Sequence, residues 1–207
     1  MSTIDLAGKL ITLEGLDYTG KSTVLRLLEH RVQKAGHRVV ASREPGGTPV
    51  GERVREVLLT VDHIEMLPLS ELLLFMVSRA QHVHEVILPA LAEGKCVLTS
   101  RFRLSSMAYQ GYGRGLDLEL IRRLNNAVCD DREADITFLI DVPVEVALRR
   151  KRGDEDRIER EDHPFYERVR SGYLELAAGD TRVHVINGTH PIEGVCDEIA
   201  KRLDLPF

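Results

Sequence analysis

The chain has few of the features that mark extracellular, membrane or nucleic-acid-binding proteins. Its three cysteines are odd in number and include no Cys-x-x-Cys pair, so we expect neither a disulfide framework nor a zinc site. The longest apolar run, 72–77, is too short to span a bilayer, and the N-terminus has no basic segment followed by an apolar one. A formal net charge of −5 argues against bulk attraction to nucleic acid or anionic membranes. We therefore expect a cytoplasmic protein with no nucleic-acid and no membrane partner.

The sequence also lacks internal repeats and low-complexity linkers, and its 207 residues fit a single domain, 1–207. Short apolar runs alternate with longer helical patterns. The expected strands are 9–14, 38–42, 96–100, 136–141 and 183–187. The expected helices are 22–35, 50–60, 69–93 with a bend at Pro89, 117–128, 144–152, 164–178 and 192–203.

Strands this short and apolar are usually buried on both faces of a parallel sheet. Their alternation with helices predicts an α/β protein of three layers, α/β/α, built on a five-stranded parallel sheet. Ligands of such folds bind beyond the carboxyl ends of the strands. We therefore expect the functional residues to follow the strands directly.

The eight residues after the first expected strand fit the phosphate-binding pattern G-x-x-x-x-G-K-[ST]. They are Gly15, Leu16, Asp17, Tyr18, Thr19, Gly20, Lys21 and Ser22. The glycines let the backbone N–H groups point inward at phosphate oxygens, and the next helix directs its positive end to the same place. In this pattern the lysine reaches the β- and γ-phosphates and the Ser22 hydroxyl binds Mg²⁺. The segment predicts a P-loop.

Asp17 lies inside this loop, where a carboxylate beside phosphates is electrostatically unfavourable unless it has a partner. Two interpretations stay open. The side chain binds a hydroxyl group or a metal-bound water, or it only forms the turn.

Five segments resemble those of the thymidylate kinase family, in the family's order and over about residues 9–190. They are the P-loop with Glu14 and Thr23, the run Arg43-Glu44-Pro45-Gly46-Gly47-Thr48, 72–75 with Arg79, 101–115, and 141–150. The P-loop alone indicates only nucleoside triphosphate binding. The second segment and the Ala108-Tyr109-Gln110-Gly111 part of the fourth are the ones typical of this family.

The resemblance implies which residues bind each substrate. Those implied for ATP are Gly15, Leu16, Asp17, Tyr18, Thr19, Gly20, Lys21, Ser22, Thr23 and Arg149. Those implied for dTMP are Asp17, Arg43, Pro45, Phe75, Arg79, Arg101, Ser105, Ser106, Tyr109 and Gln110. Arg43 would hold the acceptor phosphate and Arg101 would bridge the donor and acceptor phosphates. By the same resemblance, the bond before Pro45 would be cis.

Two aromatic residues of this set have a second interpretation. From the residues alone, Phe75 fits an apolar core stripe, and Tyr109 fits a core helix as well as a place beneath the sugar. The i, i+4 spacing of Phe75 and Arg79 puts both on one helix face. That spacing favours a site in which Phe75 stacks on the pyrimidine and Arg79 bonds to its edge.

A basic run, 149–157, follows the fourth expected strand and its helix. Taken alone, such a run is usually a solvated surface. Its position resembles the small arginine-rich lid of the family, about 149–163. Because Tyr18 in the P-loop is not basic, the chain resembles members that carry their catalytic arginine in the lid. The implied catalytic residues are Lys21, Arg101, and the lid arginines Arg152 and Arg157, between which the sequence does not choose.

The chain departs from the family at Ser100, where an aspartate that organises the magnesium shell is usual. Serine donates and accepts hydrogen bonds but carries no charge, so we expect slower catalysis or an altered metal dependence. A milder departure is Asn187-Gly188-Thr189, where Asp-Ala-[Ser/Thr] is common.

The resemblance implies an enzyme that phosphorylates dTMP to dTDP with ATP and Mg²⁺, by in-line phosphoryl transfer, and that forms a homodimer through helices. Two alternatives stay open. The chain is another pyrimidine nucleotide or deoxynucleoside kinase, or it is a weakly catalytic nucleotide-binding regulatory protein on the same scaffold.

Overall fold

A computed structural model of the chain describes residues 5–151, 153 and 155–205. These residues form the predicted five-stranded parallel sheet, with strand order β2-β3-β1-β4-β5. The strands are β1 (Leu10–Glu14), β2 (Val39–Arg43), β3 (Cys96–Ser100), β4 (Ile136–Asp141) and β5 (Val183–Asn187). The bounds differ from the expected ones by one residue, at β1 and β2.

Burial explains why the central strands are the most apolar. Every residue of β1 and β3 is buried, whereas most residues of the edge strands β2 and β5 are half-buried or exposed. In the register, Leu13 of β1 pairs with Ser100 of β3 and Phe138 of β4. The carboxyl ends of neighbouring strands therefore meet at one edge, and the P-loop begins there.

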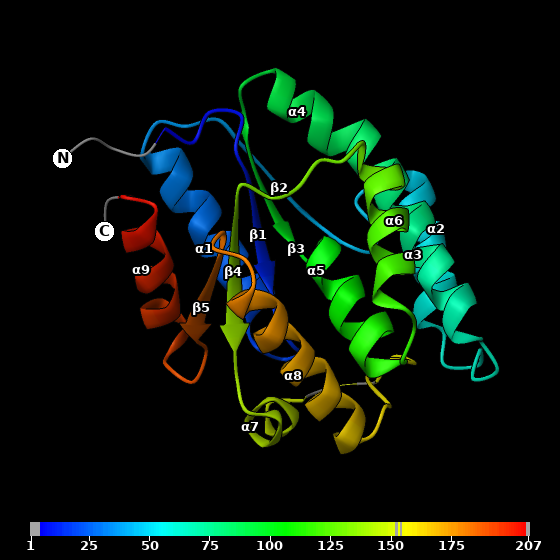
Figure 1. Cartoon of the computed structure of the whole chain (residues 1–207). Helices are drawn as coiled ribbons and strands as arrows, with labels where there is room; N and C mark the ends of the chain where they lie inside the picture. Colours follow the sequence, from blue (N-terminus) through cyan, green and yellow to red (C-terminus); the bar gives the residue numbers. More distant parts are fainter. Residues whose placement is uncertain (1–4, 152, 154, 206–207) are drawn as a thin grey trace.

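Helices cover both faces of the sheet, which completes the predicted three layers. The helices α1 (Lys21–Lys34) and α9 (Ile192–Arg202) pack together on one side. On the other side lie α5 (Arg103–Ser106), α6 (Leu118–Cys129) and α8 (His163–Ala178) (Figure 1). Within the described residues, no helix combines the length and apolar character needed to cross a bilayer.

Two helices flank the carboxyl edge beside β2. The helix α2 (Pro49–Leu59) begins after Thr48, whose hydroxyl accepts a hydrogen bond from the Gly51 N–H at 3.0 Å. It packs on α3 (Pro68–His82). The short α7 (Val144–Arg149) follows β4 and ends three residues before the expected limit at 152.

The expected helix 69–93 is divided in the structure. After α3, a π-helical turn runs over Val83–Ile87, and α4 covers Leu88–Ala92. The N–H of Leu88 bonds to the carbonyl of Val83, five residues back. Pro89 has no N–H to continue the ordinary helical pattern, which gives the interruption a physical cause near the predicted bend.

A second π-helical segment, η2 (Met107–Gly113), was not predicted as a helix. Its two glycines weaken any helical pattern in the sequence. They are needed for packing, because a Cβ on Gly111 would lie 2.4 Å from Leu118 and one on Gly113 would lie 2.7 Å from Phe165. Tertiary contact with α8, rather than intrinsic propensity, therefore sets this segment.

Candidate active site

The turn from β1 to α1 has the geometry of a phosphate-binding loop. Gly15 has φ of 135°, and a Cβ there would lie 2.5 Å from the backbone oxygen of Ile140. Gly20 has a left-handed conformation at the start of α1, which glycine adopts without strain. The backbone conformation and close packing of the loop therefore require glycine at both positions of the motif. The loop places Lys21 in the first turn of α1.

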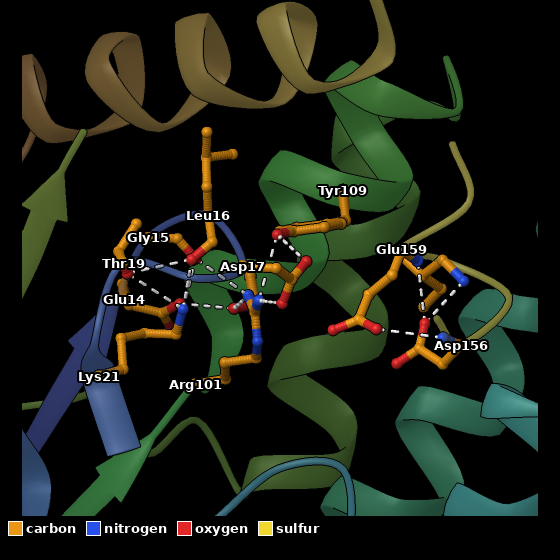
Figure 2. A network of polar contacts seen from close by, with 12 residues as sticks. Glu14, Gly15, Leu16, Asp17, Thr19, Lys21, Arg101, Tyr109, Asp156 and Glu159 are labelled. Atoms are coloured by element: carbon orange, nitrogen blue, oxygen red, sulfur yellow. Dashed lines mark hydrogen bonds and ion pairs between the residues drawn. The ribbon is translucent and has the colours of Figure 1, made fainter. Parts of the chain in front are cut away.

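Lys21 is buried within this loop. Its Nζ donates hydrogen bonds to the backbone oxygens of Gly15, at 3.1 Å, and Leu16, and to Oγ1 of Thr19 at 3.3 Å (Figure 2). Burial lowers the pKa of Lys21 to about 7, and the positive charge of Arg101 contributes in the same direction. The loop therefore holds an ammonium group that gains stability from an added negative charge.

Arg101 follows β3 directly and lies beside the P-loop. It has φ of 70°, uncommon for a residue with a side chain and often found at functional sites. Its Nη1 donates to the Gly15 oxygen at 3.2 Å, and its Nη2 donates to Oδ1 of Asp17 and to the Tyr109 hydroxyl. The guanidinium also lies 4.8 Å from the centre of the Tyr109 ring. Arg101 thus joins the P-loop to the segment around Tyr109, which is distant from the P-loop in the sequence.

Asp17 accepts two hydrogen bonds in the structure, from Arg101 and, at 2.8 Å, from the Tyr109 hydroxyl (Figure 2). Burial raises the pKa of this carboxyl, but the charges of Arg101 and Lys21 more than offset burial and hold it below its ordinary value. Of the two interpretations above, the structure favours a carboxylate with partners over one that only forms the turn.

A cavity of about 370 Å³ opens beside the P-loop. Fifteen of the predicted binding residues line it. They are Asp17, Tyr18, Gly20, Lys21, Ser22, Thr23, Arg43, Pro45, Phe75, Arg79, Arg101, Ser105, Ser106, Tyr109 and Gln110. The fold therefore brings together residues that span almost a hundred positions of the sequence.

At one end of the cavity two arginines lie near Pro45. Arg43 makes a bidentate pair with Glu52, with distances of 2.8 and 3.0 Å, and both side chains are exposed. The Nη1 of Arg55 donates to the Pro45 oxygen at 3.1 Å. Burial and the charge of Arg43 both lower the pKa of Arg55. The Glu44–Pro45 bond is cis, as the resemblance implied. Two neighbouring cations make this end a place for an anion.

At the other end, Arg79 is buried among four partners. Its Nε donates to Glu44 Oε2 at 2.7 Å, its Nη1 donates to Ser106 and Asn125, and its Nη2 donates to the Phe102 oxygen. A guanidinium has five N–H donors, so one remains for another acceptor. Glu44 also pairs with His82 at 3.0 Å. Arg79 is therefore held in one orientation.

Phe75 and Tyr109 serve both the core and the cavity. Phe75 is half-buried, packs against the main hydrophobic core and lines the cavity. Tyr109 is buried edge-on against Phe165 and Tyr173, with ring centres 6.1 Å apart in each pair, while its hydroxyl bonds to Asp17. The two interpretations that the sequence left open are thus compatible.

Ser22 and Ser100 supply hydroxyl oxygens to this cavity. Ser22 is exposed at the start of α1, and Ser100 ends β3. With Asp17 they form a set of hard oxygen donors, the type that Mg²⁺ prefers. The residues present therefore fit magnesium, with one carboxylate fewer than the family pattern has.

Several predicted residues lie elsewhere. Leu16 and Thr19 are buried within the loop, where Thr19 donates to the Leu16 oxygen at 3.0 Å. Arg149 is exposed on α7, with its Nε on the Glu145 oxygen. Arg152 lies outside the described residues.

The structure places Arg157, one of the two lid arginines that the resemblance implied to be catalytic, away from the cavity. Arg157 is buried, and it is absent from the described residues that line the active cavity. Its Nη2 lies 2.7 Å from Oε2 of Glu71, and its Nε donates to the Leu58 oxygen. A buried carboxylate, which needs a positive partner, thus holds this arginine away from the cavity.

Sequence reasoning missed four polar residues that line the cavity. They are Glu44, Arg55, Asp156 and Glu159. Arg53 and Arg55 lie two positions apart, so a helix directs them to different sides; Arg53 pairs with Glu56 in solvent, while Arg55 faces the cavity. Asp156 and Glu159 lie across the cavity from Lys21 and Arg101 (Figure 2). In the sequence, these four residues were marked only by their closeness to the segments that resemble the family.

Comparisons with known proteins agree with this geometry. A sequence model of the family described as thymidylate kinase matches residues 13–199. The thymidylate kinase of Geobacter sulfurreducens is 45% identical over 202 residues, which cover 93% of this chain and 95% of that protein. That of Pelotomaculum thermopropionicum is 49% identical over 176 residues, covering 84% and 82%.

The fold comparison extends to almost the whole chain. The crystal structure of thymidylate kinase from Ehrlichia chaffeensis superposes with a TM-score of 0.80 and 38% identity, covering 96% of this chain and 99% of that one. The family model, the relatives and the fold comparison thus all indicate the same family as the P-loop and the arginine-lined cavity do. The chain belongs to the thymidylate kinase family, and it is a kinase that phosphorylates dTMP.

Proposed function

We propose that the chain transfers the γ-phosphoryl group of Mg²⁺-bound ATP to dTMP, giving ADP and dTDP, within the cavity beside the P-loop. The observation that carries this proposal is the junction at Arg101, whose guanidinium contacts the P-loop through Gly15 and Asp17 and the acceptor side through Ser105 and Tyr109. A cation at that junction can neutralise phosphates arriving from both sides.

The protein acts by positioning and by charge. The P-loop N–H groups and Lys21 hold the donor phosphates, and Arg43 with Arg55 holds the acceptor phosphate. Arg101 stabilises the charge that develops while the phosphoryl group moves between them. No residue needs to form a covalent intermediate, since alignment of the two phosphates in a cavity shielded from water supplies much of the rate.

Magnesium would be held by the Ser22 hydroxyl with Ser100 and Asp17 nearby. When bound, it supplies positive charge to the phosphate oxygens. Ser100 carries no charge, so the chain's own residues contribute less to that site than an aspartate there would.

The end of the cavity that contains Phe75 and Arg79 would bind the thymine base and provide specificity. Phe75 offers a face for the pyrimidine ring, and the remaining N–H of Arg79 can bond to a carbonyl oxygen at its edge. Ser106 orients Arg79 at 2.9 Å, and Gln110 lines the same wall. Tyr109 closes the space beneath the sugar.

Supply of a catalytic arginine from the lid stays a prediction. The sequence named Arg152 and Arg157 for this role, and because Arg157 is paired with Glu71, we propose Arg152. We also propose that the whole chain works as one domain.

We further propose a homodimer formed through α3. Within 72–77, Leu72 and Met76 are buried in the protein, while Leu73 and Val77 are about half exposed. Leu69 continues that outer stripe one turn earlier at 46% exposure. An exposed apolar stripe of this kind is typical of an interface. Light-scattering mass measurement on the wild type and on Leu73→Glu tests it, and a wild-type monomer at all concentrations would reject it.

A cytoplasmic location is also proposed. Cys96, Cys129 and Cys196 are buried and unpaired, as is usual in a reducing compartment.

A coupled ADP-release assay tests the proposed reaction. ATP and Mg²⁺ are supplied with dTMP, dUMP, dCMP, CMP and thymidine in turn. We expect turnover with dTMP, weaker turnover with dUMP, and loss of turnover when Mg²⁺ is chelated. Preference for CMP or thymidine would favour another pyrimidine kinase, and ATP binding without turnover of any acceptor would favour a regulatory protein.

A further inference from the structure

Glu71, in the first turn of α3, is a fully buried carboxylate that the reaction outlined above does not use. It accepts a hydrogen bond from Gln110 Nε2 at 2.8 Å and two from Arg114, at 3.0 and 3.2 Å. The Nη2 of Arg157 lies 2.7 Å from its Oε2. Three side chains from two separate segments thus converge on one carboxylate.

Both of those segments form walls of the active cavity. Gln110 belongs to η2 and lines the cavity itself. Arg157 does not line it, but its neighbours Asp156 and Ile158 do. Arg157 is also tied to the end of α2, because its backbone N–H donates to the Leu59 oxygen at 3.1 Å. Glu71 therefore contacts both cavity walls from outside the cavity: the wall that contains Gln110 and the wall formed by residues 156–159.

The charges around Glu71 are balanced. Arg114 also pairs with Glu161 and stacks over the Phe165 ring at 4.8 Å, so two guanidinium groups face two carboxylates. Burial raises the pKa of Glu71, but Arg114, Gln110 and Arg157 together more than offset burial and hold the pKa below its ordinary value. Removing this one carboxylate would leave Arg114 paired with Glu161 alone and would take away the carboxylate that Arg157 contacts. An uncompensated buried charge is strongly destabilising, so we expect the segments that carry these arginines to shift.

We propose that Glu71 is a positioning residue of the kinase: it holds Gln110 and the cavity wall 156–159 in one arrangement, so that dTMP binding and exclusion of water from ATP depend on each other. The inference rests on the proposed function, because it takes Gln110 to lie on the dTMP side. Gln110 donates to Glu71 through its Nε2, so its Oε1 takes no part in that contact, and the residue lines the cavity. Reorienting Gln110 would therefore alter the acceptor side directly.

The first variant is Glu71→Gln, which keeps the size and removes the charge. We expect the dTMP dissociation constant, measured by calorimetry, to rise about tenfold, with a smaller change in kcat. Because the wall 156–159 is no longer held, we expect ATP hydrolysis in the absence of dTMP to rise about tenfold relative to phosphoryl transfer. If Glu71 had a purely structural role, the variant would lower the midpoint of thermal unfolding. It would change neither the dTMP dissociation constant nor the rate of ATP hydrolysis relative to phosphoryl transfer.

A charge-balanced variant distinguishes the effect of Glu71 on Gln110 from its effect on the wall 156–159. In Glu71→Gln with Arg157→Gln, one positive and one negative charge are lost, and the carbonyl oxygen of Gln at position 71 can still accept from Gln110. We expect dTMP affinity to return to within about threefold of wild type while ATP hydrolysis stays high, because the link through Arg157 is missing. Glu71→Asp, which keeps the charge, should lie between wild type and Glu71→Gln in both readouts.

The matched control is Glu119→Gln, which breaks an exposed pair with Arg122 on α6 and should change neither readout. Wild-type affinity and wild-type hydrolysis in folded Glu71→Gln would overturn the inference. If Glu71→Gln does not fold, wild-type hydrolysis in the charge-balanced variant would overturn it instead. Absence of dTMP turnover by the wild type would count against the proposed function alone, since the calorimetric comparison does not need turnover.

Discussion

Arg43 and Arg79 both line the active cavity, but they are held in different ways. Arg43 lies at the surface, where its side chain is 46% exposed and its pair with Glu52 is open to water. Arg79 is 2% exposed and uses four of its five N–H donors on the protein. An exposed pair contributes little to stability, so its carboxylate can be exchanged for a phosphate at small cost. A buried pair orients its arginine before the ligand arrives, and it ties recognition to stability.

The largest effect expected from this comparison is on stability, at Arg79. Arg79→Met would leave Glu44 buried beside His82 without its main cation. We expect the free energy of unfolding to fall by about 3–5 kcal/mol, measured by urea denaturation. The double variant Arg79→Met with Glu44→Gln should recover a part of that loss, and an additive result would contradict the coupling.

A substitution of Lys21, which lies in the P-loop, is expected to change the rate of catalysis rather than the stability of the protein. Lys21→Ala should lower kcat by a factor on the order of 10²–10³, because a preorganised charge on the transferred phosphoryl group is lost. The ADP-release assay measures it. Lys34→Ala, at the exposed end of the same helix, is the control that should retain wild-type turnover. Unchanged turnover in Lys21→Ala would remove this residue from the mechanism.

Arg43 is the counterpart of Arg79 in this comparison. Arg43→Met should raise KM for dTMP about 10–100-fold, the loss expected for hydrogen bonds to a charged group. Its free energy of unfolding should stay within about 0.5 kcal/mol of wild type, because the pair with Glu52 is exposed. A stability loss as large as that of Arg79→Met would erase the distinction between the two arginines.

The lowered pKa of Lys21 predicts a pH dependence of ATP binding. With a pKa of about 7 in the free protein, Lys21 is largely neutral above that pH, whereas bound phosphates favour its charged form. Binding should therefore take up a proton above pH 7, and affinity should fall up to about tenfold per pH unit between pH 7 and 9. Calorimetry in two buffers of different ionisation enthalpy detects the proton. Lys21→Met should lose this uptake.

The smallest effect expected is at Ser100. Ser100→Asp adds a carboxylate beside Ser22 and Asp17, and we expect half-maximal activity at a Mg²⁺ concentration about three- to tenfold lower. Direct titration of Mn²⁺ into the ATP complex gives a reading independent of turnover. Ser100→Asn adds a side chain of similar size without the charge and should not show the gain.

Much of the fold could be predicted because its elements repeat simple patterns. The apolar runs of β1 and β3 indicated buried parallel strands, and the alternation of strands with helices indicated a parallel sheet in three layers. The order of the strands within the sheet was not predicted. The segment η2 was missed because its glycines, poor helix formers, are required by contacts with Leu118 and Phe165. No local pattern carries that information.

The candidate site shows the same division. Residues in motifs, such as Lys21 and Arg101, could be assigned from spacing and resemblance. The partner of Arg157 could not, since Glu71 lies 86 positions away and stands in an ordinary helical pattern. Arg55 was missed for a similar reason, because the rotation of α2 decides which arginine faces inward.

The sequence by itself determined the P-loop, the five-stranded parallel sheet and the family, because glycine spacing, apolar runs and motif residues are local properties. Only the tertiary structure decided which charges are paired. Whether an arginine binds a phosphate or neutralises a buried carboxylate depends on the groups that the fold places within a few ångströms of it, and those groups come from distant parts of the chain.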